Sequence, residues 1–316
     1  MTMSNDIELG LVELTPYGYI DRDHHHRTDI FWRDHQAWLA EKGYIPRVHS
    51  QPDRTPLWTD KREACQNYWD GAISKRSDLI DAIRLSDGET VMMKTFSRDE
   101  NPHEKEITTF LASEPAKSHP RNHSNVLYEV LDTPGKDMSL LVMPALDRFH
   151  EPGFDNIGEV LECLRQIFEG LQFLHNCGIA HRALTDRNIM MDSRKLRSRS
   201  YDDIPLVKNP FSRTPQAPRY YIIDFGLSRR YPFDNSHRLN ICPEVKDDPF
   251  AMDVCCLGNV IQRRILETYT GCEFLQPLVD AMCDPDVQRR LTIKEVVEQY
   301  DQILHSRWWW QLRARV

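Results

Sequence analysis

The sequence predicts an α+β fold in which strands come first and helices dominate the second half. Two β-type runs flank Ser86-Asp87-Gly88 within residues 78–97, which indicates a hairpin. A continuous apolar run of strand length, SLLVMPAL, follows at 139–146. Between residues 157 and 174 apolar side chains recur at helical spacing, and this helix is expected to stop before Gly178.

Length and charge limit the possible classes of protein. The chain has 316 residues, 40% of them hydrophobic, which is enough for one large core or two modest ones. A net charge of -8 gives no global attraction to nucleic acid or to anionic membrane. No apolar run approaches the roughly 20 residues that span a bilayer, and the acidic N-terminus is unlike a secretory signal. We therefore expect an intracellular protein, cytoplasmic or nuclear, without a nucleic-acid or membrane partner.

The first 75 residues differ in composition from the rest of the chain. They are polar, rich in aromatic residues and interrupted by prolines. One helical segment, TDIFWRDHQAWLAEKG, ends at Gly43. We expect residues 1–75 to form an extension that packs on or flanks the next domain.

The remaining elements are predicted from helix-start signals and composition. Asn101 and Pro102 begin a helix, and Glu104 would complete a capping box with Asn101. The polar, arginine-rich stretch between Asp192 and Tyr220 is expected to be a disordered or loosely attached loop. Further helices are expected over 248–267 and from Thr292, where Glu295 completes a second capping box.

A set of separated motifs resembles the protein kinase family over roughly residues 78–305. HRALTDRN, at 181–188, resembles the catalytic loop H-R-D-L-x-x-x-N, with Ala183 where that loop has its aspartate. Asp224-Phe225-Gly226 is an intact D-F-G. The other matching positions, in chain order, are Val91-Met92-Met93-Lys94, Glu106, Met143, Cys242-Pro243-Glu244, Asp253 and Arg290. The chain is also similar to short, divergent fungal kinase-like proteins with a leader of the FWRDHQAWL type.

This resemblance implies a bilobal fold, with a small β-rich N-lobe and a larger helical C-lobe. The kinase-like domain would cover residues 76–306, with the N-lobe at about 76–143 and the C-lobe at about 147–306. Residues 307–316 would form a tryptophan-rich tail. Three adjacent tryptophans, 308–310, cannot all face one core, so at least one is expected to be exposed, where it could mark a protein partner's surface.

The resemblance also implies a site for ATP and Mg²⁺. Phosphoryl transfer requires a lysine on the phosphates, a glutamate that holds the lysine, and oxygen or amide ligands for magnesium. Lys94, Glu106, Asn188 and Asp224 would supply these groups. Met92, Met143 and Ala145 would border the base, although Met92 replaces the family's usual small alanine.

The glycine-rich loop of the family is not matched. Counting back from Lys94 without gaps, its three glycines fall on Ala72, Ser74 and Ser77. Since these residues reach positive φ only at a cost, their amides are expected to wrap phosphates less well. Nucleotide binding should therefore be weakened.

Ala183 implies a catalytic defect. The family's aspartate at this position orients the attacking hydroxyl and accepts its proton, and losing such a base costs about 10²- to 10⁴-fold in rate. Asp186 is the only nearby carboxylate and would be a weak substitute, while Arg182 is retained. Three interpretations stay open: a nucleotide-binding pseudokinase, a slow protein kinase acting on Ser or Thr, or a kinase-fold scaffold without nucleotide.

Overall fold

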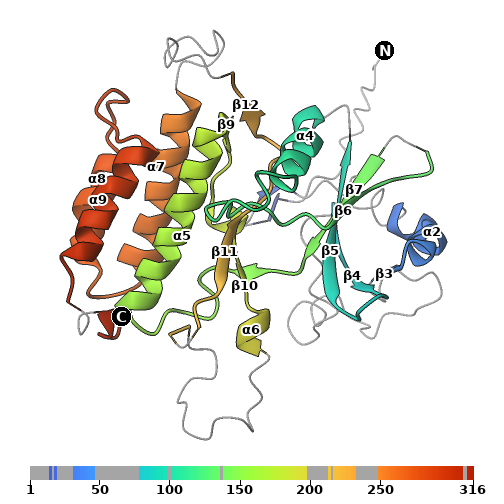
Figure 1. The fold of residues 1–316 in the computed structure, drawn as a ribbon, viewed down its shortest axis with the longest axis horizontal. Coiled ribbons are helices and arrows are strands. Elements are labelled where there is room, and N and C mark those ends of the chain that lie inside the picture. The colour runs from blue at the N-terminus through green and yellow to red at the C-terminus, as the bar shows by residue number, and fades with distance from the viewer. Residues whose placement is uncertain are drawn as a thin grey trace, which may run out of the picture.

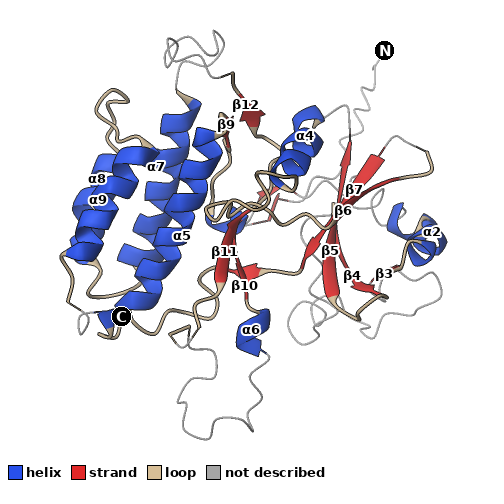
Figure 2. Ribbon diagram, in the orientation of Figure 1, coloured by secondary structure: helices blue, strands red, loops and turns tan. Residues whose placement is uncertain are grey.

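The computed structural model describes residues 14–15, 18–19, 31–46, 78–97, 101–135, 138–197, 213–214, 216–232, 248–308 and 312–316. These residues form two lobes (Figure 1). One lobe is built on a β-sheet and the other mainly on helices, as the colouring by secondary structure shows (Figure 2). The α+β, bilobal architecture predicted from the sequence is confirmed.

The smaller lobe contains a five-stranded antiparallel sheet. Its strands, in the order β3-β4-β5-β7-β6, are Tyr44–Pro46, Leu79–Arg84, Thr90–Ser97, Met138–Pro144 and Glu129–Asp132. The predicted hairpin joins β4 to β5, with Gly88 at a φ of 73° that favours glycine. Tyr44 Oη donates a hydrogen bond to Glu129, which ties together the two edge strands of the sheet.

One face of this sheet packs against the segment that precedes it. Because side chains alternate along a strand, Val91 and Met93 of β5 point to the opposite face from Met92 and Lys94. Val91 and Met93 share a buried cluster with Trp32 and Leu39, which precede or lie in helix α2, Gln36–Glu41. The segment expected to be an extension thus supplies both a cover for the sheet and its edge strand β3.

Helix α4, Pro102–Leu111, begins at Asn101 as predicted. Its buried residues Ile107 and Leu111 belong to the same core cluster as the large lobe. The predicted capping box is wrong, because Asn101 makes no side-chain cap and the Glu104 side chain is directed instead to Lys94.

The larger lobe is a group of packed helices. In chain order they are α5 Ile157–Asn176, α7 Pro249–Ile261 continued by a π-helical turn Gln262–Leu266, the 3-10 helix Glu273–Leu275, α8 Gln276–Met282 and α9 Ile293–His305. Helix α5 contacts α9, and α7 contacts α8 (Figure 1). Asn156 caps α5, and Thr292 forms the predicted capping box with Glu295.

Short strands that follow β7 in the chain form two further small sheets. They are β8 Asp147–Arg148, β9 Ile179–Ala180, β10 Ile189–Asp192, β11 Arg219–Ile222 and β12 Arg229–Arg230. The order β11-β10-β8 forms one small sheet, and β12 pairs with β9. The 3-10 helix Asp186–Asn188 lies directly before β10, and α6, Arg194–Arg197, follows it. Near the N-terminus β1, Leu14–Thr15, pairs with β2, Gly18–Tyr19.

Arg213 anchors the end of the stretch between Asp192 and Tyr220. Its side chain is only 2% exposed and donates hydrogen bonds to the carbonyls of Phe149 and Pro152 and to Tyr220 Oη. The guanidinium also lies 4.2 Å from the centroid of the Phe154 ring. The prediction of a loosely attached loop is therefore wrong for its C-terminal end, while residues 198–212 lie outside the described part.

Two further sequence predictions bear on the surface. Trp308 is 67% exposed, which confirms that the tryptophans at 308–310 do not all enter one core. In the described residues no helix has both the length and the apolar composition needed to cross a membrane.

Candidate active site

Lys94 of β5 is held between two carboxylates where the lobes meet. Its ammonium group lies 2.5 Å from Glu104 Oε1 of α4 and 2.8 Å from Asp224 Oδ1, which follows β11. Lys94 is 7% exposed and Glu104 is 1% exposed. The structure therefore brings together residues from a strand, a helix and a loop that are up to 130 positions apart.

Burial and charge act in opposite directions on this lysine. Burial favours the neutral amine, but the carboxylates of Glu104 and Asp224 outweigh it, so the pKa of Lys94 lies above its usual value. Burial also raises the pKa of Glu104, against the opposing effect of Lys94. Glu104 Oε2 is buried and accepts no hydrogen bond from any other described residue. Lys94 thus carries a positive charge in a site with little access to water.

The prediction that Glu106 holds Lys94 is wrong. Glu106 is exposed and lies 3.9 Å from His103, whereas Glu104 makes the contact with Lys94. Two residues correspond to about 200° around a helix, so the two glutamates point to opposite sides of α4. Ile107 and Leu111 mark the buried side, and Glu104 precedes them by three and seven residues. This spacing was the sequence signal that identifies Glu104.

Asn188 and Asp224 are adjacent because β10 and β11 pair next to them. The amide N–H of Ile223 donates to the Asn188 carbonyl at 2.9 Å, and Asn188 Nδ2 donates to the Ala183 carbonyl at 2.9 Å. Asp224 has a φ of 71°, a costly conformation for a residue with a Cβ. Strained backbone of this kind is common at active sites.

The loop that carries Ala183 is fixed from beneath by Asp253 of α7. This aspartate is fully buried and accepts hydrogen bonds from the amides of His181 at 2.6 Å and Arg182 at 2.7 Å. His175 Nε2 lies 3.1 Å from the same carboxylate. Arg182 has a φ of 65°, and its own side chain is exposed. Asp253 therefore sets the backbone course of the loop.

The carboxylate of Asp186, the predicted weak substitute for the catalytic base, forms an ion pair with Arg264. Its carboxylate accepts hydrogen bonds from Arg264 Nε at 2.8 Å and from a second guanidinium nitrogen of Arg264. Partial burial would raise the pKa of Asp186, but the hydrogen bond and charge of Arg264 outweigh it and lower the pKa. A carboxylate of this kind accepts a proton poorly.

The residues predicted to border a base lie on strands β5 and β7. Met92 is directly opposite Met143 in the strand register, and it shares its sheet face with Lys94. Ala145 follows the last residue of β7 and is half-buried. Ala72, Ser74 and Ser77, predicted to stand in for the glycine loop, lie outside the described residues.

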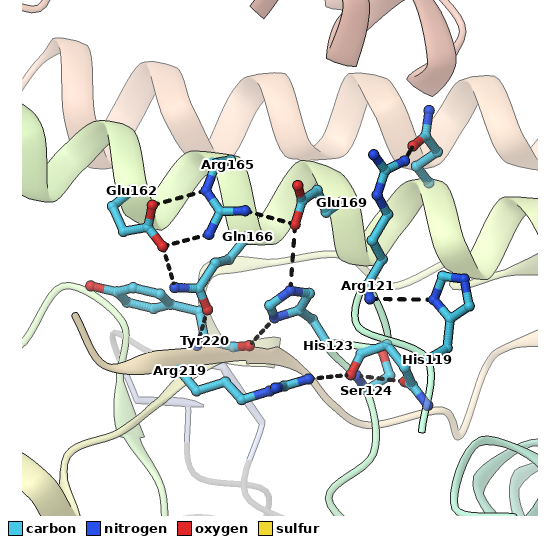
Figure 3. Close-up of polar contacts among 12 residues, drawn as sticks. His119, Arg121, His123, Ser124, Glu162, Arg165, Gln166, Glu169, Arg219 and Tyr220 are labelled. Atoms are coloured by element: carbon cyan, nitrogen blue, oxygen red, sulfur yellow. Dashed lines mark hydrogen bonds and ion pairs between the residues drawn. The ribbon is translucent and has the colours of Figure 1, made fainter. Parts of the chain in front are cut away.

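A polar network joins the strand before Asp224 to helix α5 (Figure 3). Gln166 of α5 accepts from the amide of Tyr220 at 3.0 Å and donates to the carbonyl of Pro218 at 3.1 Å. His123 Nδ1 lies 3.0 Å from the Tyr220 carbonyl, and burial lowers the pKa of His123. Gly170 permits the close approach of this loop, since a Cβ there would lie 2.8 Å from the Cβ of His123. The edge of β11 that does not pair with β10 is thus hydrogen-bonded to Gln166 and His123.

This network was not predicted from the sequence. Its partners are separated by about 50 to 100 positions and belong to segments with no shared motif. They border a surface hollow of about 650 Å³ between α5 and β11. Their contacts are with one another, so the network positions β11, and hence Asp224, rather than taking part in the site.

Comparisons with known proteins bear on the family of this chain. The family model described as "Protein kinase domain" matches residues 75–245, more than half of the chain. Serine/threonine-protein kinase oca2 of Schizosaccharomyces pombe is 26% identical over 180 residues. That match covers 52% of this chain but only 26% of the oca2 protein, so the chain spans about a quarter of this relative.

A solved structure also aligns with part of this chain. The structure titled "Crystal structure of Rad53 kinase domain and SCD2 in complex with AMPPNP" aligns with a TM-score of 0.46 at 18% identity. The alignment covers 70% of this chain and 84% of that one. On the match of the family model, this chain belongs to the protein kinase superfamily.

Proposed function

We propose that this chain is a nucleotide-binding pseudokinase, which takes up ATP with Mg²⁺ between its lobes and serves a binding or regulatory role. The observation that carries the proposal is the buried group of Lys94, Glu104 and Asp224, with Ala183 nearby in place of a catalytic aspartate. A lysine and carboxylates of the kind that hold phosphates and magnesium are thus combined with a missing base. We also propose that the protein is intracellular and that its regulatory role involves a protein partner.

The residues present fit a nucleotide and a magnesium ion. Lys94 would contact the phosphates, and Glu104 would keep its ammonium group in place. The carboxylate of Asp224 and the side-chain oxygen of Asn188 are the hard ligands that Mg²⁺ prefers, completed by phosphate oxygens. When bound, Mg²⁺ would supply positive charge against the phosphates. Because Lys94 is opposed by two carboxylates, the site has no surplus positive charge, and binding should depend on the metal.

The catalytic step is impaired because, among the residues that the structure describes, no group near Ala183 is arranged to accept a proton. The methyl group of Ala183 neither orients a hydroxyl nor takes up its proton. Asp186 is hydrogen-bonded to Arg264, which lowers its pKa and occupies its carboxylate. The expected rate is therefore about 10²- to 10⁴-fold below that of a kinase with the aspartate.

A thermal-shift titration tests nucleotide binding. A ligand that binds only the folded state raises its stability, so ATP with Mg²⁺ should raise the Tm of the natural chain. ATP with EDTA should give a smaller shift, and Lys94→Met should abolish the shift. Glu106→Gln is the matched control and should respond like the natural chain. No shift at millimolar ATP and Mg²⁺ would contradict the nucleotide proposal and favour the scaffold without nucleotide.

A radiolabel transfer assay separates the pseudokinase from the slow kinase. The assay compares the rates at which the natural chain, Ala183→Asp, Asp186→Asn and Lys94→Met transfer phosphate to a generic protein substrate. We expect the natural chain to transfer little or no phosphate, and Asp186→Asn to leave that low rate unchanged. If the natural chain equals Ala183→Asp and loses transfer with Lys94→Met, it is a working enzyme.

A further inference from the structure

Two cysteines meet where helices α7 and α8 pack together (Figure 1). Cys255 lies in α7, and Cys283 is the residue at which α8 ends. The thiol of Cys283 donates a hydrogen bond to the backbone carbonyl of Cys255 at 3.5 Å. Both cysteines are free and half-buried. Two thiol-bearing residues 28 positions apart in the chain are thus in direct contact.

The close approach of Cys283 to α7 depends on Gly258, which lies one turn after Cys255. A Cβ at Gly258 would lie 2.5 Å from the sulfur of Cys283, which is closer than non-bonded atoms approach. Positions three apart on a helix are neighbours, with Cβ atoms about 5 to 6 Å apart. The sulfur of Cys283 therefore occupies the space that Gly258 leaves open, on the side of α7 that also carries Cys255.

The spacing of these groups suits a disulfide bond. A disulfide requires Cβ atoms about 3.5 to 4.5 Å apart. Because the sulfur of Cys283 is already 3.5 Å from the backbone of Cys255, we expect side-chain rotation alone to bring the two sulfurs together. The thiols also affect each other, since burial, followed by the charge of Cys255 and a hydrogen bond with it, raises the pKa of Cys283 to about 12.

The two sulfur atoms differ in their access to solvent. Asn259, which is exposed, donates a hydrogen bond from Nδ2 to the sulfur of Cys255 at 3.7 Å, so this sulfur lies on the solvent side of α7. The raised pKa of Cys283 keeps its proton in place, and a thiol reacts with oxidants more slowly than a thiolate. A small oxidant should therefore react with Cys255 first, and Cys283 is placed to react second.

We propose that Cys255 and Cys283 form a reversible disulfide when the protein meets a peroxide. The Cys255 thiolate attacks one peroxide oxygen and the O–O bond breaks, which gives a sulfenic acid, while the departing hydroxide takes up the proton that Cys255 has lost. The sulfur of Cys283 then attacks the sulfur of Cys255. The S–S bond forms, the S–O bond breaks, and a second departing hydroxide takes the proton of Cys283. Each cysteine sulfur loses one electron overall, and each peroxide oxygen gains one.

The bond would join α7 to α8 close to the residue that fixes the loop at Ala183. Asp253, two residues before Cys255 in α7, accepts the hydrogen bonds from the amides of His181 and Arg182. A disulfide restricts the unfolded chain, so oxidation should stabilise this helical lobe. Disulfides of intracellular proteins are usually transient and redox-sensing, which agrees with a reversible bond. The proposal does not depend on nucleotide binding.

Treatment of the full chain with hydrogen peroxide, followed by tandem mass spectrometry of its tryptic peptides, tests the proposal. Fragmentation must locate the bond, because one tryptic peptide contains both Cys255 and Cys256 and another contains both Cys272 and Cys283. We expect a link between Cys255 and Cys283 that dithiothreitol reverses, and a Tm about 3 °C or more above that of the reduced chain. Bond formation should be faster at higher pH, because Cys283 has to lose its proton.

Single substitutions connect the bond to this pair. Cys255→Ser and Cys283→Ser should each abolish the bond and the rise in Tm. Cys256→Ser is the matched control, because Cys256 is the next residue of α7 and is also half-buried, and this variant should form the bond like the natural chain. Cys65 and Cys242 lie outside the described residues, so every variant is also made in a chain that has serine at both positions. Circular dichroism checks that each reduced variant is folded.

Three results would overturn the proposal. The first is that Cys255 stays reduced, or is converted to sulfinic acid, without forming the bond to Cys283. The second is that the main product links either residue to Cys256 or Cys272, or links two chains. The third is an equal yield of the same bond from a chain unfolded in urea, which would show that the contact in the folded protein does not direct it. Because the natural chain alone decides all three, a variant that fails to fold leaves the result readable.

Discussion

At the scale of single residues, the orientation of two glutamates decides the chemistry of the site. Glu104 and Glu106 are two positions apart and have the same side chain. Only Glu104 is on the buried side of α4, where its carboxylate meets the ammonium group of Lys94. Glu106 is exposed to water, which screens its charge. The burial of Glu104 makes its interaction with Lys94 strong and its loss costly.

Replacing each glutamate by glutamine tests this difference. Glu104→Gln should lower the free energy of unfolding by about 1 to 3 kcal/mol, because it removes a charge-assisted hydrogen bond from buried Lys94. Glu106→Gln should change it by less than about 0.5 kcal/mol. Urea denaturation followed by circular dichroism measures both. Equal effects of the two changes would show that Glu106 also supports the site.

At the scale of secondary-structure elements, β11 and its neighbours are held by side chains as well as by strand pairing. Gln166 of α5 and the loop around His123 complete the outer edge of β11 (Figure 3). Arg213 fixes the segment before β11 to the carbonyls of Phe149 and Pro152. Since β11 leads directly to Asp224, these contacts determine where the D-F-G motif lies relative to Lys94.

Among the side chains that hold β11 in place, Arg213 should contribute most to the free energy of unfolding. Arg213→Ala should destabilise the protein by about 3 to 5 kcal/mol, because it removes a buried guanidinium and leaves its acceptors unpaired. Arg219→Ala is the control from the same segment, since its exposed side chain bonds one carbonyl, of Asn122, at 3.0 Å. It should cost less than about 1 kcal/mol. The measurement is urea denaturation, and similar losses for both variants would contradict a special role for Arg213.

At the scale of the whole molecule, residues 31–46 are part of the small lobe. Helix α2 covers one face of the five-stranded sheet, and β3 forms one edge of it (Figure 1). Leu39 is fully buried and belongs to the sheet's core cluster. The opposite face carries Met92 and Lys94 towards the large lobe. The same sheet therefore packs against α2 on one face and presents Lys94 of the candidate site on the other.

The contribution of this segment can be measured with two aliphatic substitutions. Leu39→Ala should lower the free energy of unfolding by about 2 to 5 kcal/mol through lost burial and the cavity left behind. Ile45→Ala, on β3 but 41% exposed, should cost no more than about 1 kcal/mol. Thermal and urea denaturation measure both. If Leu39→Ala were as mild as Ile45→Ala, residues 31–46 would be a dispensable extension.

The sequence by itself determined the fold class, the order of the main elements and some of the residues that meet between the lobes. Hydrophobic periodicity predicted α5, turn residues predicted the β4–β5 hairpin, and ordered motifs predicted Lys94, Asn188 and Asp224 as neighbours. These inferences succeeded because each depends on residues close together in the chain, or on a spacing that repeats in the family.

Only the tertiary structure decided which side chains meet. In the structure Glu104, and not Glu106, contacts Lys94, and the Asp186 carboxylate is paired with Arg264. Arg213 is buried in a segment that the sequence predicted to be loosely attached. A local pattern states which residues can form a helix, but the burial of one helix face depends on the partner it packs against. The contacts of Gln166 and His123 with Tyr220, which join residues about 50 to 100 positions apart, are set by that packing, and no local signal encodes them.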